Sequence, residues 1–388
     1  MKLPEAFIRQ MQGELGAQAP AFFSTYEEEG AAGLRVSLRR GWTPPEGFAP
    51  VPWCPAGFYV PQGLRMGKEP LHAAGAYYLQ EPSAMAPAAA LGVRPGMRVL
   101  DLCAAPGGKS TQIADLLGGQ GILVANEIHP ARARILLENV ERMGVPNAVV
   151  CNETPARSHE RQMEILEDAA RCLRGGGTLV YSTCTFNRVE NEGTIEAFLR
   201  RHPEFSLDPE LALPGIPCQG GMAHLYPHQV RGEGHFLARL RKRGEERAEL
   251  AELPVDKGEA RWEAFSREAL REAAPRRLRA QGEWLYAIPE GMPDVRGLNV
   301  LRAGVQLGRL AKGRLEPAHA LALSLAPGEA QEEREVSREE ALRYLGGEVL
   351  EGEMRGWGLL RCQRCALGWG KGSGGQIKNH YPKGLRWR

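Results

Sequence analysis

The sequence lacks any apolar run long enough to cross a membrane. No stretch of 18 consecutive apolar residues occurs in the 388-residue chain, although 43% of its residues are hydrophobic, and a spanning helix needs about 20 such residues. The first residues, MKLPEAFIRQMQGEL, also lack the apolar core and the small-residue cleavage site of a secretory signal. We therefore expect a cytoplasmic protein with no membrane partner.

Cysteine is also scarce. Eight cysteines are scattered along the chain, so we do not expect a disulfide framework, and a reducing compartment is the default. Cys362 and Cys365 form one CxxC pair with no second pair, and His380 would add only a third ligand. Because structural zinc takes four protein ligands, we expect no metal site.

Acidic residues are missing from the last 35 residues. From Met354 to Arg388 there are eight Lys or Arg and no Asp or Glu, so the rest of this +2 chain carries a net −6. A basic block of this kind commonly meets phosphate, although a solvated tail is the alternative. Disordered tails contain few aromatics, so nucleic acid is favoured, and we expect the aromatics to be free to stack on exposed bases: Trp357, Trp369, Tyr381 and Trp387.

Changes in local sequence pattern divide the chain into four parts. Residues 1–80 begin with a helical pattern and form a small mixed α/β domain, which we expect to bind RNA. In residues 81–242, short apolar runs (MRVLDLC, GILVANE, NAVVCN, TLVYSTC, GHFLARLRK) alternate with helical stretches. Such alternation predicts an α/β fold with an open, mostly parallel, Rossmann-like sheet. Residues 243–325 hold charged helices and a first small module, and residues 326–388 form a second β-rich module.

The stretch LDLCAAPGGKST at residues 100–111 resembles a phosphate-binding P-loop only at its end. A P-loop has a glycine six residues before its lysine, and Cys103 occupies that position. Glu127 ends the next apolar run, twenty residues after Gly107, where doubly wound folds place a carboxylate on ribose hydroxyls. The sequence therefore predicts a nucleoside-cofactor loop, with Asn152 beside the adenine. The loop residues are Cys103, Ala104, Ala105, Pro106, Gly107, Gly108 and Lys109.

Two motifs together resemble a known family. CAAPGGK at 103–109 and STCTF at 182–186 are similar to the RNA 5-methylcytosine methyltransferases that use S-adenosylmethionine. YYLQEPSAM at 77–85, VENE at 189–192 and GEGHF at 232–236 extend the match. LGWGKGSGGQIKNHYPKGLR at 367–386 resembles the PUA-like RNA-binding end of the bacterial small-subunit ribosomal RNA members. The resemblance implies S-adenosyl-L-methionine as cofactor, and small-subunit ribosomal RNA or the 30S subunit as partner. We expect a monomer.

The resemblance assigns the catalytic role to Cys184, at the end of TLVYSTC. Carbon 5 of cytosine is a poor nucleophile, and addition of a cysteine thiolate to carbon 6 activates it, which is covalent catalysis. Ligands of doubly wound folds bind at the carboxyl ends of the strands, so the position suits this chemistry. The alternative is a buried, inert cysteine that closes a strand.

One motif of the resembling family is absent. Its members carry a further strand that ends in a D-A-P-C-S-G-type motif, and here Asn152 is followed almost at once by the helical stretch QMEILEDAA. A sheet without this central strand should not bury its core properly. Either the printed chain omits a segment between about Pro155 and His159, or a true deletion has left a catalytically inactive RNA-binding or ribosome-assembly factor. A P-loop nucleotidase is disfavoured.

Overall fold

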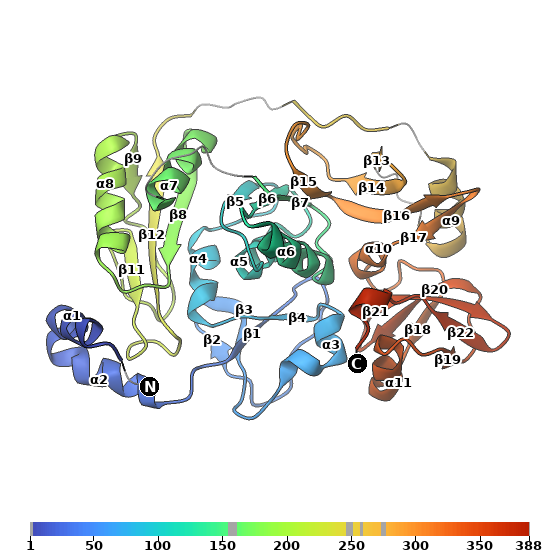
Figure 1. Ribbon diagram of the computed structural model, residues 1–388, viewed down its shortest axis with the longest axis horizontal. Helices are drawn as coiled ribbons and strands as arrows, with labels where there is room; N and C mark the ends of the chain where they lie inside the picture. Colours follow the sequence, from blue (N-terminus) through green and yellow to red (C-terminus); the bar gives the residue numbers. More distant parts are fainter. Residues whose placement is uncertain (1–2, 154–160, 246–250, 257–258, 273–276, 388) are drawn as a thin grey trace.

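The computed structural model describes residues 3–153, 161–245, 251–256, 259–272 and 277–387 (Figure 1). The junction proposed between Pro155 and His159 lies outside these residues. Within the described ranges, no helix is both long and apolar enough to cross a membrane.

The N-terminal part consists of two short helices followed by a four-stranded antiparallel sheet. The sheet has the order β2-β3-β1-β4. In Figure 1 the helices lie apart from this sheet, next to the end of β11 and β12. The N-terminal part thus contacts two different regions of the molecule. Its elements are α1 (Glu5–Leu15), α2 (Ala19–Ser24), β1 (Gly33–Val36), β2 (Pro50–Val51), β3 (Cys54–Tyr59), α3 (Pro70–Ala73) and β4 (Tyr77–Leu79).

The first half of the central region contains three of the expected parallel strands. β5, β6 and β7 pair in parallel, and their apolar side chains pack against α5 and α6 in one core. A strand from far along the chain, β15, pairs antiparallel with β7 and closes that edge. The elements are α4 (Ala86–Ala90), β5 (Arg98–Asp101), α5 (Gly108–Leu117), β6 (Ile122–Asn126), α6 (Pro130–Arg142), β7 (Ala148–Cys151) and β15 (Val300–Ala303).

The second half of the central region forms a separate sheet. Its order is β10-β11-β12-β8, with β9 also paired to β12, and its core contains side chains of α7 and α8. The elements are α7 (Arg161–Cys172), β8 (Thr178–Thr183), the π-helical turn η5 (Val189–Gly193), α8 (Thr194–Arg201), β9 (Phe205–Leu207), β10 (Cys218–Gln219), β11 (Met222–Leu225) and β12 (His235–Lys242).

All five strands expected from the apolar runs are therefore present, and the α/β fold class is confirmed. The single open sheet is instead divided between β5 and β8, which do not pair. Every residue of β8 is partly exposed, and Leu100 on β5 is 39% exposed, whereas parallel strands are normally covered on both faces. Among the described residues no strand lies between these two edges, at the place where the sequence lacks the motif-bearing strand.

The C-terminal part contains two β-rich modules, as expected. The first has the sheet order β13-β14-β16-β17, and the second has the order β18-β20-β21-β22-β19. In Figure 1 they lie one above the other on the right of the molecule. Their elements are α9 (Ala260–Ala269), β13 (Arg277–Gln281), β14 (Trp284–Ile288), β16 (Val305–Ala311), β17 (Arg314–Pro317), α10 (His319–Ser324), β18 (Glu333–Glu335), α11 (Arg338–Leu345), β19 (Leu350–Glu351), β20 (Gly356–Cys362), β21 (Cys365–Ser373) and β22 (Gln376–Asn379).

The basic C-terminal residues belong to a folded sheet, and this corrects the expected role of their aromatics. Trp369 is 1% exposed and donates a hydrogen bond from Nε1 to the Ala318 carbonyl, and Tyr381 is 6% exposed. Trp357 and Trp387 are partly buried and pack against the two cores of this region. The four aromatics therefore hold the module together, and the two most buried are not available to stack on bases.

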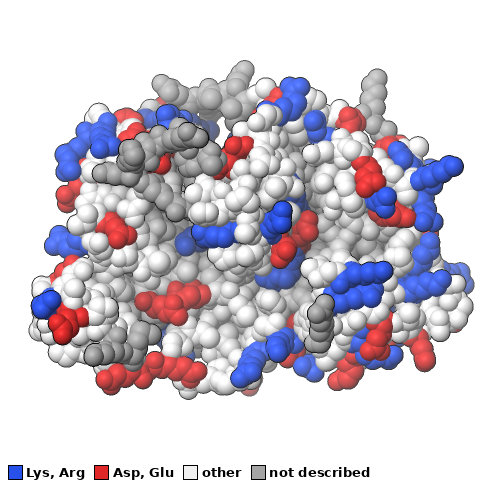
Figure 2. All heavy atoms as spheres, in the orientation of Figure 1, with Lys and Arg blue, Asp and Glu red and all other residues white. Residues whose placement is uncertain are grey.

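Several of these basic residues lie at the surface, whereas Arg361 is 3% exposed and paired with Glu333. Arg355, Arg364, Lys378 and Lys383 are exposed. Figure 2 shows Lys and Arg gathered over the right-hand part of the molecule, where the C-terminal modules lie. The charge expected to meet phosphate is therefore displayed by the folded module.

Candidate active site

The loop after β5 is held in place from both sides. Asp101 ends β5, and its carboxylate accepts hydrogen bonds from the Ser110 hydroxyl (2.7 Å) and from the Cys103 backbone N–H (3.3 Å). On the far side, Arg132 of α6 donates to the Ala105 carbonyl (3.0 Å), and Asn139 donates to the Pro106 carbonyl (2.9 Å). The loop is thus fixed between the end of its own strand and the next helix.

Gly107 and Gly108 are needed because the backbone here is crowded. Gly107 has φ = 118°, and a Cβ at this position would lie 3.3 Å from Asn139 and Leu136. A Cβ on Gly108 would lie 3.3 Å from Gln80, which belongs to the YYLQEPSAM segment. α5 begins at Gly108 without a side-chain cap, so its first backbone N–H groups are available to an anionic ligand.

Glu127 and Asn152 lie together at the same edge of the sheet. Glu127 is 3% exposed, and its carboxylate accepts the His129 N–H (3.0 Å) and lies 3.6 Å from the Arg132 guanidinium. Asn152 donates both amide hydrogens, to the Glu127 carbonyl (2.7 Å) and to the Ile128 carbonyl (3.0 Å). Asn152 therefore braces the segment that carries Glu127, and its donors are already used.

Cys184 follows β8 and is exposed, which contradicts the alternative of a buried cysteine. Asn191, fully buried in η5, holds both flanks of this residue. Its Oδ1 accepts the Thr183 hydroxyl (2.5 Å), and its Nδ2 donates to the Thr185 carbonyl (2.9 Å). The thiol is thus presented to solvent from a loop whose backbone is fixed on either side.

The N-terminal helices add a second support to this loop. The Phe22 ring of α2 packs edge-on against Phe186 at 5.3 Å, and Gln10 of α1 donates to the Phe186 carbonyl (3.4 Å). α1 and α2 therefore contact the segment that directly follows Cys184, which explains their separation from the N-terminal sheet.

Residues of the loop after β5 act electrostatically on strands of the second sheet. Burial, as the larger cause, and the Lys109 charge lower the pKa of His235 to about 3. His235 precedes Phe236, which pairs with Thr183 at the end of β8. Cys103 in turn lies near enough to Tyr181 of β8 to contribute to the raised pKa of that phenol, which burial mainly causes. The carboxyl ends of both halves thus contribute to one edge.

The sequence did not single out three residues of this edge. Asp101 could have been found as the last residue of the strand before the loop, and burial raises the pKa of its carboxyl despite the Ser110 hydrogen bond and the Lys109 charge. Asn191 lies within the VENE motif at 189–192, where the sequence alone gives no sign that its side chain is buried. Nothing in the sequence distinguishes Arg132 as a site residue, because it is one of several arginines on the same helix.

Family models match most of this chain in four consecutive parts. Residues 3–82 match the N-terminal domain of 16S rRNA methyltransferase RsmF. Residues 88–158 and 152–241 match 16S rRNA methyltransferase RsmB/F. Residues 264–325 match the RsmF rRNA methyltransferase first C-terminal domain, and residues 331–387 match the methyltransferase RsmF PUA domain. The central model matches in two pieces that overlap at residues 152–158.

Curated relatives extend the similarity over the whole chain. The chain is 29% identical to ribosomal RNA small subunit methyltransferase F of Vibrio vulnificus over 422 positions, covering 91% of this chain and 88% of the relative. It is 29% identical to the protein of the same name from Cronobacter sakazakii over 472 positions, covering 99% and 96%. Both alignments are longer than this chain, so the relatives contain residues that it lacks.

A solved structure shares the fold. NSun6 from Pyrococcus horikoshii, crystallised with SFG, has a TM-score of 0.54 and 19% identity, and the match covers 62% of this chain and 99% of the other. The family models, the curated relatives and this fold agree with one another. The chain belongs to the RsmF group of RsmB/F-type small-subunit ribosomal RNA methyltransferases.

Proposed function

We propose that the chain transfers a methyl group from S-adenosylmethionine to carbon 5 of cytidine in small-subunit ribosomal RNA. The observation that carries the proposal is Cys184, exposed at the carboxyl end of β8 and fixed on both flanks by Asn191. It shares an edge with the loop at 103–109, on which doubly wound folds bind their ligands.

The residues present fit S-adenosylmethionine. Glu127 retains acceptor capacity for ribose hydroxyls, because a carboxylate offers about four lone-pair sites and the described residues supply one hydrogen bond to it, from the His129 N–H. The α5 N-terminus suits the methionine carboxylate, and Gly107 and Gly108 allow close approach. Asn152 acts here by holding Glu127 in place. When bound, the cofactor supplies an electrophilic methyl group.

The chemistry proposed for Cys184 follows from the low nucleophilicity of carbon 5 of cytosine. The thiolate forms a bond to carbon 6 of cytosine, and the electron pair of the 5,6 double bond becomes available at carbon 5, which takes the methyl group. Loss of the carbon 5 proton restores the double bond, and the sulfur–carbon 6 bond breaks to release the thiolate. Cys184 is thus a nucleophile that is regenerated in each turnover.

A serine substitution tests this role. Cys184→Ser should abolish methylation and leave cofactor binding intact, because a hydroxyl is far less ionised than a thiol with a pKa near 8.5. Cys172→Ser, at an exposed cysteine on α7, is the matched control and should keep its activity. RNA that carries 5-fluorocytidine should trap the wild-type enzyme covalently, since fluorine cannot leave as the proton does. Turnover by Cys184→Ser equal to wild type would exclude the mechanism.

The divided sheet favours a second candidate, a catalytically inactive RNA-binding or assembly factor. β5 and β8 are partly exposed, and the described residues supply no strand between them, which supports this candidate. Transfer of label from methyl-labelled donor to small-subunit RNA, with mapping of 5-methylcytosine, separates the two candidates. Failure of transfer by a protein whose intact mass is 42.5 kDa would support the inactive factor, and a mass well above this value would reveal a further segment.

A further inference from the structure

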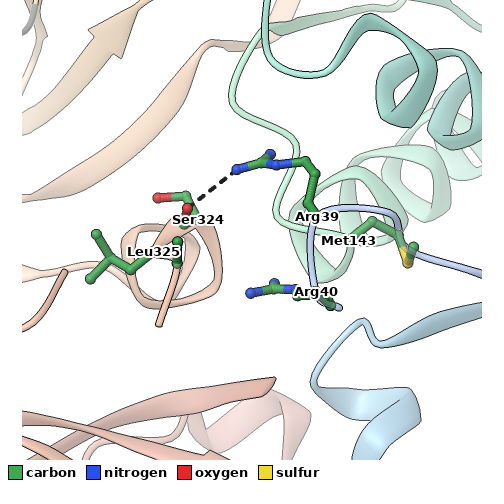
Figure 3. Close-up of a pocket in the computed structure, with 6 residues that line it drawn as sticks. Arg39, Arg40, Met143, Ser324 and Leu325 are labelled. Atoms are coloured by element: carbon green, nitrogen blue, oxygen red, sulfur yellow. Dashed lines mark hydrogen bonds between the residues drawn. The ribbon is translucent and has the colours of Figure 1, made fainter. Parts of the chain in front are cut away.

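Three distant parts of the chain meet at one cavity. Arg39 and Arg40 come from the loop after β1, Met143 directly follows α6, and Ser324 and Leu325 lie at the end of α10. The cavity has a volume of about 210 Å³. Figure 3 shows both guanidinium groups pointing toward the turn at Ser324 and Leu325. The cavity therefore joins the N-terminal sheet, the first half of the central region and the first C-terminal module.

Among the described residues, neither arginine forms an ion pair. Arg39 donates to the Gly144 carbonyl (2.6 Å) and to the Ser324 carbonyl (3.4 Å). Arg40, only 8% exposed, donates to the Leu323 carbonyl, and its Nε has no hydrogen-bond partner among the residues that the structure describes. Within the ranges that the structure describes, neither guanidinium lies within 4 Å of a carboxylate oxygen, whereas buried charges are normally paired.

The surrounding charges leave this cavity positive. Burial, as the largest cause, and the charges of Arg39 and Arg361 lower the pKa of Arg40 to about 10. Arg361 is paired with Glu333 at 2.9 Å. Asp115, whose charge acts on both cavity arginines, is paired with Arg35 at 2.6 Å. One exposed carboxylate, Glu329, also acts on Arg39 and accepts a hydrogen bond from the N–H of the lining residue Ala326 (2.7 Å). Two neighbouring cations thus face the cavity against this single carboxylate, and the local charge stays positive.

We infer that this cavity is a binding site for a phosphate group. The guanidinium fork matches the oxygens of phosphate and forms strong charge-assisted hydrogen bonds with them. The volume is several times the roughly 30 Å³ that a water molecule occupies, so a tetrahedral oxyanion fits. Met143 and Leu325 line the cavity with apolar groups, and a less polar surrounding strengthens the attraction between opposite charges. The site is separate from the edge that carries Cys184.

Calorimetry with inorganic phosphate tests the site in the full-length protein. Wild type should bind phosphate, with chloride of equal ionic strength as the reference. Arg39→Met should weaken binding by about tenfold to a hundredfold, the equivalent of one lost charge-assisted hydrogen bond. Arg314→Met is the matched control, because this arginine is exposed and does not line the cavity, and the phosphate affinity of this variant should equal that of wild type.

Arg40→Met provides a second variant. Arg39 is only half-buried, so Arg39→Met decides the question if Arg40→Met does not fold. Equal phosphate affinity in wild type and Arg39→Met would overturn the proposal, as would a wild-type response to phosphate no larger than the response to chloride.

The source of the phosphate is distinguished by competition. Binding of small-subunit RNA is measured in phosphate and in chloride at one ionic strength. Weaker RNA binding in phosphate, lost in Arg39→Met, identifies the ligand as an RNA backbone phosphate. Equal RNA binding in both salts, with the calorimetric signal retained, identifies free phosphate.

Discussion

A buried ion pair connects the stability of the central region to the loop at 103–109. Arg35 of β1, 1% exposed, donates to Asp115 of α5 (2.6 Å) and to the Thr111 hydroxyl (2.8 Å). That hydroxyl in turn donates to the Gly107 carbonyl (2.7 Å). Arg35 also donates to Gln80 (3.2 Å), whose side chain lies against Gly108. The pair thus fixes both glycines of the loop through one intervening side chain each.

Removal of one partner should therefore be costly. Asp115→Ala leaves the Arg35 guanidinium buried with only neutral acceptors, and breaking a buried pair in this way destabilises a protein by about 3–5 kcal/mol. The double variant Arg35→Met/Asp115→Leu replaces both charges by apolar groups of similar size and should lose much less. Affinity for S-adenosylmethionine should fall in Asp115→Ala as well, because Thr111 and Gln80 lose their common anchor.

Urea unfolding followed by circular dichroism measures the first effect, and calorimetry measures the second. Glu316→Ala, which breaks an exposed pair with Arg314 (2.9 Å), is the control and should change the free energy of unfolding by less than about 1 kcal/mol. A loss in Asp115→Ala no larger than that of this control, or a double variant less stable than either single one, would refute the reasoning.

Three further predictions concern pH and the candidate site. Burial and the Arg40 charge lower the pKa of His319 to about 4, below the unfolded value near 6.5. The contribution of neutral His319 to the free energy of unfolding is therefore fully present above pH 6.5. This contribution should decline as the pH falls toward 4, by up to about 1.4 kcal/mol per pH unit. Unfolding at pH 7 and pH 5 tests this, and His319→Gln should reduce the difference but not abolish it, because the lowered pKa of His235 acts in the same direction. Glu127→Ala should weaken S-adenosylmethionine binding about tenfold to a hundredfold by calorimetry, and tight magnesium-dependent ATP binding would contradict the site. Asn191→Ala frees both flanks of Cys184, so methyl transfer should slow while cofactor affinity is kept; an unchanged rate would exclude the positioning role.

The sequence by itself determined the elements that depend on local pattern. The five apolar runs of residues 81–242 became strands, and α5 begins directly after the glycine that the loop requires at φ = 118°. Strand period, helix period and turn chemistry act over a few residues, so they can be recognised without knowledge of the fold. The same kind of local pattern predicted that Cys184 lies at the end of a strand.

Only the tertiary structure decided which residues meet. Trp369 and Tyr381 were expected at the RNA surface and instead fill a core, because their surroundings come from α10 and α11. β15 closes the β7 edge from about 150 residues away. The strand pairing divides the sheet between β5 and β8. The cavity of Arg39 and Arg40 is built from three segments that are distant in the sequence. Burial and charge compensation arise from contacts between distant residues, and a local pattern carries no information about them.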